Sequence, residues 1–194
     1  MSGTRTYLEI TDPNTFHPAW TGVVGVRVDR VEGCPSSFFR YLYETVGRAY
    51  GWIDRLNWAD DEIARHLADP AMSLWVMTVA NAPAGYFELR QEEGAGTQES
   101  GGGAPTPSTR GAINSVEGER LKPGEGGSVE IAYFGLLPEF VGRGLGGHLL
   151  SVAVERAFES GARRVWLHTC PRDNPAALPN YLKRGFLPFR TQPL

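Results

Sequence analysis

The chain has 194 residues, of which 41% are hydrophobic, so it can bury one well-filled core, and a second full domain is not expected. Its formal net charge of -3 excludes a nucleic acid or an anionic membrane as the main partner, because both require a basic face. The two cysteines, Cys34 and Cys170, lie far apart, and no spacing of cysteine and histidine forms a zinc pattern, so we predict free thiols and no metal.

The first third of the chain is predicted to form two strands followed by two helices. Residues 7–10 and 23–31 are rich in β-branched residues, and in the second run valines alternate with glycine and charged residues, as in a half-buried strand. A helix is expected over residues 35–47. A second helix begins at residue 59 or 60, with acidic residues at its positive end, and Pro70 closes it.

Both helices and the loop between them are rich in aromatic residues: Phe38, Phe39, Tyr41, Tyr43, Tyr50, Trp52 and Trp58. Most of these side chains are expected to fill the space between the helices and the sheet, because large aromatic residues dominate cores. Tyr50 and Trp52 lie in the loop itself. They are the two exceptions that need not belong to the core.

Residues 74–80 and 83–89 are predicted to form two central strands joined by a turn at residues 81–82. Residues 91–127 then contain much Gly, Ser, Thr, Pro and Glu and few large apolar residues. Such a segment cannot bury enough surface to offset the entropy lost on ordering. We predict a flexible insertion between two adjacent antiparallel strands, within a single domain over residues 1–194. The alternative, a lid over a binding site, stays open.

A predicted anion site follows the next strand. Residues 129–137 are β-branched and aromatic, as in a buried strand, and Pro138 ends the run because it has no N–H for the ladder. The loop after it contains four glycines: Gly142, Gly144, Gly146 and Gly147. Their bare backbone N–H groups and the positive end of the following helix can bind a pyrophosphate, and Arg143 can add a charge-assisted bond.

Two other phosphate-binding motifs fit this loop less well. Its glycines also fit G-x-G-x-x-G, but the dinucleotide fingerprint needs an acidic residue about 20 positions later, at the end of the next strand. That strand, residues 164–169, ends without an acid. The phosphate loop of nucleotide hydrolases needs a lysine where His148 stands.

The last part of the chain is predicted to alternate between helices and strands. A helix is expected over residues 145–160 and a strand over 165–169. Asn174 suits the cap of a final helix, which Pro179 makes short or distorted at its start. Residues 186–190 form one more strand.

Two motifs in this order resemble the GNAT superfamily of acetyl-coenzyme A-dependent N-acyltransferases. The acetyl-CoA loop of that family reads Gln/Arg-x-x-Gly-x-Gly/Ala, and residues 141–146 match it except at Val141. The family's N-x-x-A-x-x-x-Y-x-K-x-G-F run matches Asn174, Ala177, Tyr181, Lys183, Gly185 and Phe186. The resemblance implies an α/β fold in which helices flank a central mixed, mostly antiparallel sheet, splayed at the strands that hold acetyl-CoA.

The resemblance also implies a set of residues that bind acetyl-CoA. Backbone groups of Leu136 and Leu137 would bond the pantetheine arm and polarise the thioester carbonyl, and Asn174 would contact the arm from the opposite wall. The full predicted set is Leu136, Leu137, Val141, Gly142, Arg143, Gly144, Leu145, Gly146, Gly147 and Asn174.

Proton transfer needs a base and an acid. An alkyl ammonium has a pKa of about 10.4, so almost all of an amine acceptor is protonated at neutral pH and a base is useful. Glu130 stands where many family members keep a carboxylate and ranks first, Glu88 second and His168 third. Tyr181 matches the position that protonates the departing thiolate. Cys170 could carry an acyl group, but nothing adjacent activates it.

We therefore expect an acetyl-CoA-dependent N-acetyltransferase that acts on a primary amine of a small molecule by direct attack. The substrate-binding residues are predicted to be Tyr50, Trp52 and Glu88. A protein N-terminal or lysine acetyltransferase and a non-catalytic acyl-CoA-binding module remain as alternatives. No apolar run reaches the roughly 20 residues of a membrane span, so a cytosolic protein without a membrane partner is expected; a homodimer stays open.

Overall fold

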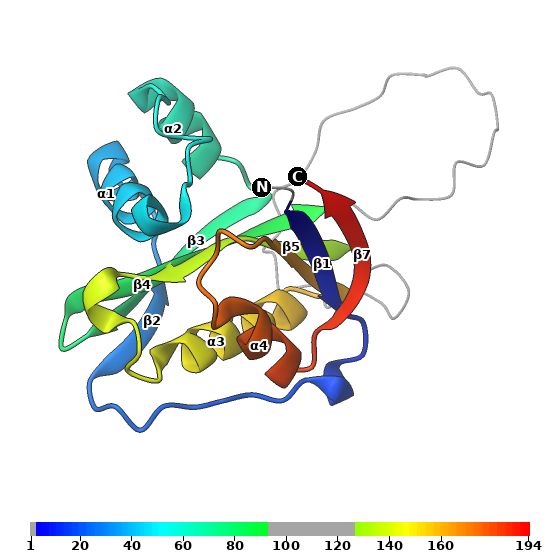
Figure 1. Ribbon diagram of the computed structural model, residues 1–194. Helices are drawn as coiled ribbons and strands as arrows, with labels where there is room; N and C mark the ends of the chain where they lie inside the picture. The colour runs from blue at the N-terminus through cyan, green and yellow to red at the C-terminus, as the bar shows by residue number, and fades with distance from the viewer. Residues whose placement is uncertain (1–2, 93–126) are drawn as a thin grey trace, which may run out of the picture.

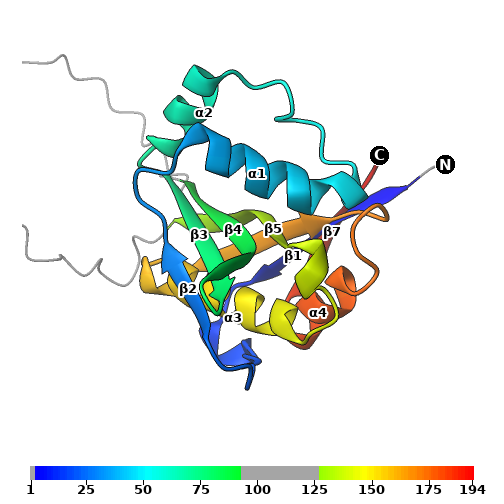
Figure 2. The same cartoon turned by 90° about the vertical axis from the view of Figure 1, so that its left-hand side faces the viewer.

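The computed structural model describes residues 3–92 and 127–194. The described chain forms seven strands and four α-helices. In chain order they are β1 (Thr4–Ile10), β2 (Val26–Arg30), α1 (Ser36–Gly47), α2 (Asp60–Leu67), β3 (Met72–Val79), β4 (Ala82–Glu92), β5 (Ser128–Leu136), α3 (Leu145–Glu159), β6 (Arg164–Thr169), α4 (Ala177–Lys183) and β7 (Leu187–Pro193). One sheet contains all of these strands and separates two helical layers, α1 with α2 and α3 with α4 (Figures 1 and 2).

The strand order in the sheet is β2-β3-β4-β5-β6-β1-β7. Only β5 and β6 run parallel, and every other described pair of neighbours is antiparallel. This arrangement confirms the expected mixed, mostly antiparallel sheet between helices. The N-terminal strand β1 is not at an edge, because it pairs with β6 on one side and with β7 on the other. Leu8 and Ile10 of β1 are fully buried as a result.

Two boundaries in the first half differ from the expectation. The run expected at residues 23–31 forms only the short strand β2. The turn between β3 and β4 lies one residue earlier than predicted, at Ala80 and Asn81, which have φ angles of 49° and 67°. A two-residue hairpin turn with positive φ at both positions matches the twist of its strands, and Asn tolerates that conformation.

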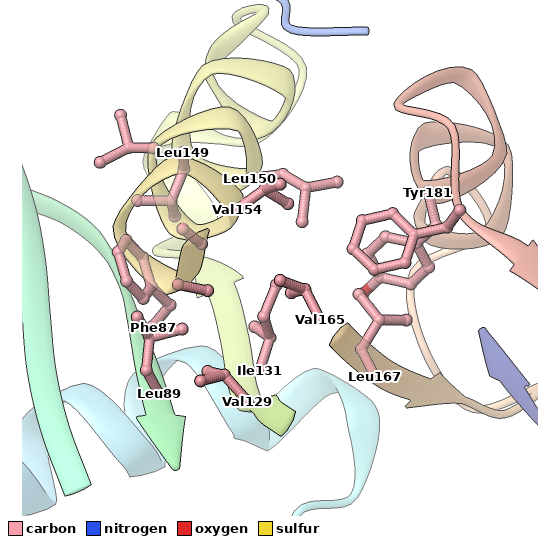
Figure 3. Packing of buried hydrophobic residues seen from close by; sticks show 14 of the residues in the cluster. Phe87, Leu89, Val129, Ile131, Leu149, Leu150, Val154, Val165, Leu167 and Tyr181 are labelled. Atoms are coloured by element: carbon pink, nitrogen blue, oxygen red, sulfur yellow. The ribbon is translucent and has the colours of Figure 1, made fainter. Parts of the chain in front are cut away.

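The α3 face of the sheet holds the larger core. Leu149, Leu150 and Val154 of α3 point towards Phe87 of β4 and Val165 of β6 (Figure 3), and all five are buried. The spacing of these three residues places them on the same side of α3. A second core lies beneath α1 and α2 on the other face, and it contains Phe39, Leu42, Val46, Ile63, Leu74 and Tyr86.

Strands β5 and β6 separate partway along their length. Their parallel pairing ends at Glu130 and Trp166, although β5 continues to Leu136 and β6 to Thr169. Strand β5 also contains a bulge: Leu89 of β4 is opposite Ile131, whereas the next residue, Glu88, is opposite Tyr133, so β5 has one extra residue there. The side chains of β5 beyond the bulge therefore point to the other face than an unbroken alternation would give. The expected splay is therefore present, and it leaves backbone groups of β5 without a strand partner on one side.

The expected insertion joins two adjacent antiparallel strands, as predicted, because β4 pairs with β5. Its first two residues still belong to the sheet, where Gln91 and Glu92 pair with Val129 and Ser128. Residues 93–126 lie outside the described residues. Within the ranges 3–92 and 127–194, no helix has the length and apolar character needed to cross a membrane.

Candidate functional site

A cavity of about 1230 Å³ opens where β5 and β6 separate. Its walls come from the glycine-rich loop before α3, the ends of β5 and β6, the start of α4, and the loop between α1 and α2. Most residues predicted for a site line it: Tyr50, Trp52, Glu88, Glu130, Leu136, Val141, Gly142, Gly144, Leu145, Gly146, Gly147, His168, Asn174 and Tyr181. The structure thus brings both predicted halves of the site into one space.

Two predicted residues do not line the cavity. The backbone N–H of Leu137 donates to the carbonyl of Ala84 at 2.9 Å, and its side chain is buried in the core beneath α1 and α2. The Arg143 guanidinium lies 5.0 Å from the ring centroid of Phe140. Its charge remains near the glycine loop, but the side chain is outside the cavity wall.

The glycine loop has the shape of an anion cradle. Gly142 and Gly144 have φ angles of 79° and 75°, in the left-handed region, and a Cβ at either would meet nothing within 4 Å. Helix α3 begins directly afterwards with no side-chain bond to cap it, so its first N–H groups keep their donor capacity. Open backbone beside a free helix N-terminus favours binding of a phosphate.

An arginine that the sequence analysis missed adds to this cradle. Nη1 of Arg184 lies 2.9 Å from the position that a Cβ on Gly147 would take. No ion pair among the described residues includes Arg184, and its Nε is buried without a hydrogen bond. Arg184 directly follows the last residue of α4, Lys183. Only the packing of α4 against α3 places it beside the glycine loop.

A hydrogen bond crosses the cavity between two loops that are far apart in the sequence. Nδ2 of Asn174 donates to the hydroxyl of Tyr50 at 3.1 Å, while its Oδ1 accepts from the backbone N–H of Ala176 at 2.9 Å. The predicted cap is therefore wrong: the N-cap of α4 is Ala176, and the Oδ1 of Asn174 closes a turn just before the helix. The amide of Asn174 still has one N–H free, as it carries two. Helix α4 starts three residues after it, at Ala177.

Tyr181 is held by aromatic packing rather than by hydrogen bonds. Its ring lies 6.2 Å from those of Phe134 and Phe186, and it reaches from α4 towards Leu167 of β6 (Figure 3). Burial raises the pKa of its hydroxyl, and the charge of Asp173 adds to that shift. The phenol therefore keeps its proton at neutral pH and can donate it inside the cavity.

Glu130 carries a carboxylate that is free to act. It lies at the last position where β5 pairs with β6, and it lines the cavity. Burial, reinforced by the charge of Glu92, raises the pKa of its carboxyl above the usual value, although Arg90 and Arg55 oppose the shift. A carboxylate with a raised pKa and no hydrogen bond from a described side chain is suited to accept a proton.

Glu88 is in a different state, because its carboxylate is already fully paired. Nη1 of Arg55 lies 2.7 and 2.8 Å from its two oxygens, and Nε2 of His66 lies 2.8 Å from one of them. Burial alone would raise the pKa of this carboxyl, but the His66 hydrogen bond and the Arg55 charge outweigh it and hold the pKa below its usual value. Glu88 is therefore poorly suited to accept a proton.

Arg55 is fixed between Glu88 and a set of aromatic rings. Its Cζ lies 4.1 Å from the ring centroid of Tyr133 and 4.8 Å from that of Trp58. These contacts are favourable for a desolvated guanidinium. Trp52 packs beside them, with its ring 5.0 Å from that of Tyr133. The ion pair thus anchors the loop between α1 and α2 as a wall of the cavity.

Replacing Glu88 with glutamine is expected to lower the free energy of unfolding by about 3 kcal/mol, because it leaves the buried Arg55 without a counter-charge. Urea denaturation measures the change. The control is Asp61→Asn, which removes an exposed ion pair with Arg65 and should change stability little. A Glu88→Gln variant as stable as the wild type would show that this pair does not hold the wall.

The remaining candidates have less chemical capacity. Burial lowers the pKa of His168, and the nearby charge of Arg5 adds to that effect, so the ring is neutral at neutral pH. The sulfur of Cys170 lies 3.9 Å from Oδ1 of Asp173, a negative group that opposes a thiolate. Among the described residues, no group of three or more His, Cys, Asp or Glu is placed to hold a metal ion.

The sequence matches a model of the Acetyltransferase (GNAT) family over residues 37–186, which is more than half of the chain. A comparison with curated proteins finds no match.

Three of the solved structures that are similar to this chain illustrate the likeness. A GCN5-related N-acetyltransferase from Kribbella flavida has 18% identity and a TM-score of 0.57, over 97% of this chain and 55% of its own. One from Sphaerobacter thermophilus has 16% identity and a TM-score of 0.59, over 97% of this chain and 49% of its own. An aminoglycoside acetyltransferase from an uncultured soil metagenomic sample has 14% identity and a TM-score of 0.56, over 82% of this chain and 88% of its own. The chain spans about half the length of the first two, and at these identities the likeness shows the fold.

Proposed function

Because this chain belongs to the GNAT family of acetyltransferases, whose members use acetyl-CoA as acyl donor, we propose that it transfers an acetyl group to a primary amine of a small molecule by direct attack. One observation carries the proposal: a single cavity joins the glycine loop to Glu130 and Tyr181. A donor bound at the loop and an amine bound near Glu130 would share the space between β5 and β6.

The residues present fit the donor. The open backbone at Gly142 and Gly144, the free N–H groups at the start of α3 and the guanidinium of Arg184 would hold its diphosphate. The free N–H of Asn174 would contact the pantetheine arm. Backbone groups of β5 beyond Glu130, which lack a β6 partner, would orient the arm in the splay.

The chemistry requires proton transfers at both reacting atoms. The ammonium loses two protons in all, one before the attack and one after it, and the leaving thiolate gains one, so the second nitrogen proton replaces the one that the acid gives to sulfur. When bound, acetyl-CoA supplies an activated thioester. Glu130 would remove the proton from the acceptor ammonium, directly or through a water, so that the amine becomes a nucleophile. Tyr181, which stays protonated, would donate to the sulfur that leaves. Cys170 has no part in this route, so no acetyl group is carried by the protein.

A small acceptor is supported by the wall opposite the glycine loop. The loop from Gly51 to Arg55 lines the cavity, and the Arg55–Glu88 ion pair anchors it. A polypeptide acceptor would need an open groove here. An acceptor that fits beside Trp52 and Tyr133 is a compact amine with some apolar surface.

The Glu130→Gln variant tests the assignment of the base. We expect its activity to be low at neutral pH and to recover as the pH rises towards the pKa of the amine, because the amine then deprotonates without help. The wild type should become active as Glu130 ionises, at a pH above that of an ordinary carboxyl because its pKa is raised. Rate profiles of kcat/KM against pH measure both.

The matched control is Glu139→Gln, an exposed carboxylate outside the cavity. Its profile should overlay that of the wild type. If the Glu130→Gln profile also overlays the wild type, Glu130 is not the base, and His168 becomes the first candidate, because Glu88 is already paired with Arg55 and His66.

A further inference from the structure

Arg5 of β1 is a cation at the cavity with no partner. It lines the wall, and its Nε is buried without a hydrogen bond. None of the ion pairs among the described residues includes it. A buried polar group without a partner is unfavourable, so its presence needs an explanation.

Two other described arginines also have a buried Nε without a partner, and the comparison is informative. Arg156 lies outside the cavity, and its charge is met by Glu159 through Nη1. Arg184 lies at the glycine loop, where the diphosphate of the donor would meet its charge. Arg5 has no carboxylate partner, and it does not belong to the proposed donor site. By the same reasoning it awaits an anion from another molecule.

Arg5 lies on the face of the sheet that carries the proposed base. In the register of β1 with β6, Tyr7 is opposite His168, and Arg5 is two residues further along the same face. Glu130 is opposite Trp166, which shares a face with His168. The charge of Arg5 also helps to lower the pKa of His168, in keeping with their positions on this face. Arg5, His168 and Glu130 therefore face the same side of the cavity.

Two carboxylates that line the cavity, those of Asp54 and Asp173, already accept hydrogen bonds from other groups. Oδ2 of Asp173 accepts from the hydroxyl of Thr169 at 2.7 Å and from the backbone N–H of Cys170 at 2.9 Å. Asp54 accepts from the hydroxyl of Tyr133 at 3.3 Å. Neither carboxylate forms an ion pair with Arg5.

We propose that the acceptor is an amine that also carries an anionic oxygen group, a carboxylate or a phosphate, and that Arg5 binds this group while the amine meets Glu130. Arginine suits such groups because its planar fork donates two parallel hydrogen bonds. This inference rests on the proposed acetyl transfer. In the register, Arg5 lies two strands and four positions away from Glu130. With strands about 4.8 Å apart and a rise of about 3.3 Å per residue, the two backbone positions lie roughly 16 Å apart, and the acceptor spans the gap that the two side chains leave between them.

Series of amine acceptors that differ only in the group at the far end test this proposal. We would measure thiol release with ω-amino carboxylates of increasing length, with their carboxamides, and with ω-amino phosphates. In the wild type, kcat/KM for the best anionic acceptor should exceed that of its carboxamide by about 10- to 100-fold. Arg5→Gln should remove this preference by slowing only the anionic acceptors, and Arg5→Lys should restore part of it.

The control is Arg190→Gln on the neighbouring strand β7, because Arg190 lies over the ring of Tyr7 but does not line the cavity. It should leave the preference unchanged. Carboxamides that are as good as the anionic acceptors in the wild type would overturn the inference. So would an Arg5→Gln variant that slows both classes equally.

A binding measurement makes the inference testable without turnover. With coenzyme A present, the protein is titrated with N-acetylated ω-amino carboxylates and with the matching carboxamides while the NMR signals of His168 are followed. We expect these signals to shift at concentrations at least 10-fold lower for the carboxylates than for the carboxamides. Arg5→Gln should abolish this difference. Equal affinity for both, or no binding of either, would overturn the inference. A wild type that binds no acetyl-CoA would instead overturn the proposed function.

Discussion

Replacing Tyr181 with phenylalanine is expected to lower kcat by about 10- to 1000-fold while the affinity for acetyl-CoA stays near the wild-type value. The ring would remain between Phe134 and Phe186, so the fold and the cavity wall should persist. Only the hydroxyl is lost. Because burial raises the pKa of this hydroxyl, the wild-type group is protonated over the whole neutral range and can donate to the leaving thiolate.

Steady-state kinetics and calorimetry of acetyl-CoA binding, made on the same preparations, measure the two quantities. The control is Tyr41→Phe, which removes an exposed hydroxyl on α1. A Tyr181→Phe variant with wild-type kcat would mean that water protonates the thiolate and that Tyr181 only packs. Lower affinity with unchanged kcat would assign the hydroxyl to binding rather than to catalysis.

Replacing Gly144 with valine and Gly146 with leucine is expected to abolish acetyl-CoA binding. Gly144 adopts a φ of 75°, which a β-branched residue strongly disfavours, so the loop must change its path. A leucine at 146 would also occupy space at the start of α3, where the diphosphate would bind. The helix itself packs through other residues, so the fold should persist. Calorimetry measures the binding, and circular dichroism checks the fold.

Gly33 offers a matched control, because it has a φ of 63°, open surroundings and no place in the cavity wall. Gly33→Val introduces similar backbone strain but should leave acetyl-CoA binding intact. Wild-type affinity in the double glycine variant would show that the loop is not the cradle.

The parts of the site that follow from local sequence could be predicted. The glycine loop is a continuous segment between a strand and a helix, and its glycines are required by the positive φ at residues 142 and 144. The run from Asn174 to Phe186 is local in the same way. Short-range patterns of this kind determine the local backbone conformation directly, so they can be recognised in the sequence without knowledge of the fold.

The parts that depend on long-range pairing could not be predicted. The insertion of β1 between β6 and β7 brings Arg5 to the cavity, and nothing in residues 4–10 indicates this neighbour. The same holds for Arg184 at the glycine loop. Each contact joins positions that are far apart in the chain, and periodicity carries no information about such pairs.

The choice between the two glutamates shows the same limit. Glu88 and Glu130 both lie within strands rich in apolar residues, and the sequence ranks them only by resemblance. The structure separates them by environment, because Arg55 and His66 pair with Glu88, whereas Glu130 has a raised pKa and a free carboxylate. The state of a carboxyl depends on partners that fold around it, so it cannot be read from the residue alone.

The central claim is that acetyl passes from acetyl-CoA directly to an amine bound beside Glu130. Mass spectrometry after mixing protein, acetyl-CoA and a panel of small amines and peptides tests it most directly. We predict an acetylated small amine, one coenzyme A released for each acetyl transferred, poor transfer to peptides, and no acetyl group on the protein. Acetyl-CoA bound tightly with no acetylated amine would contradict the account and favour a binding module.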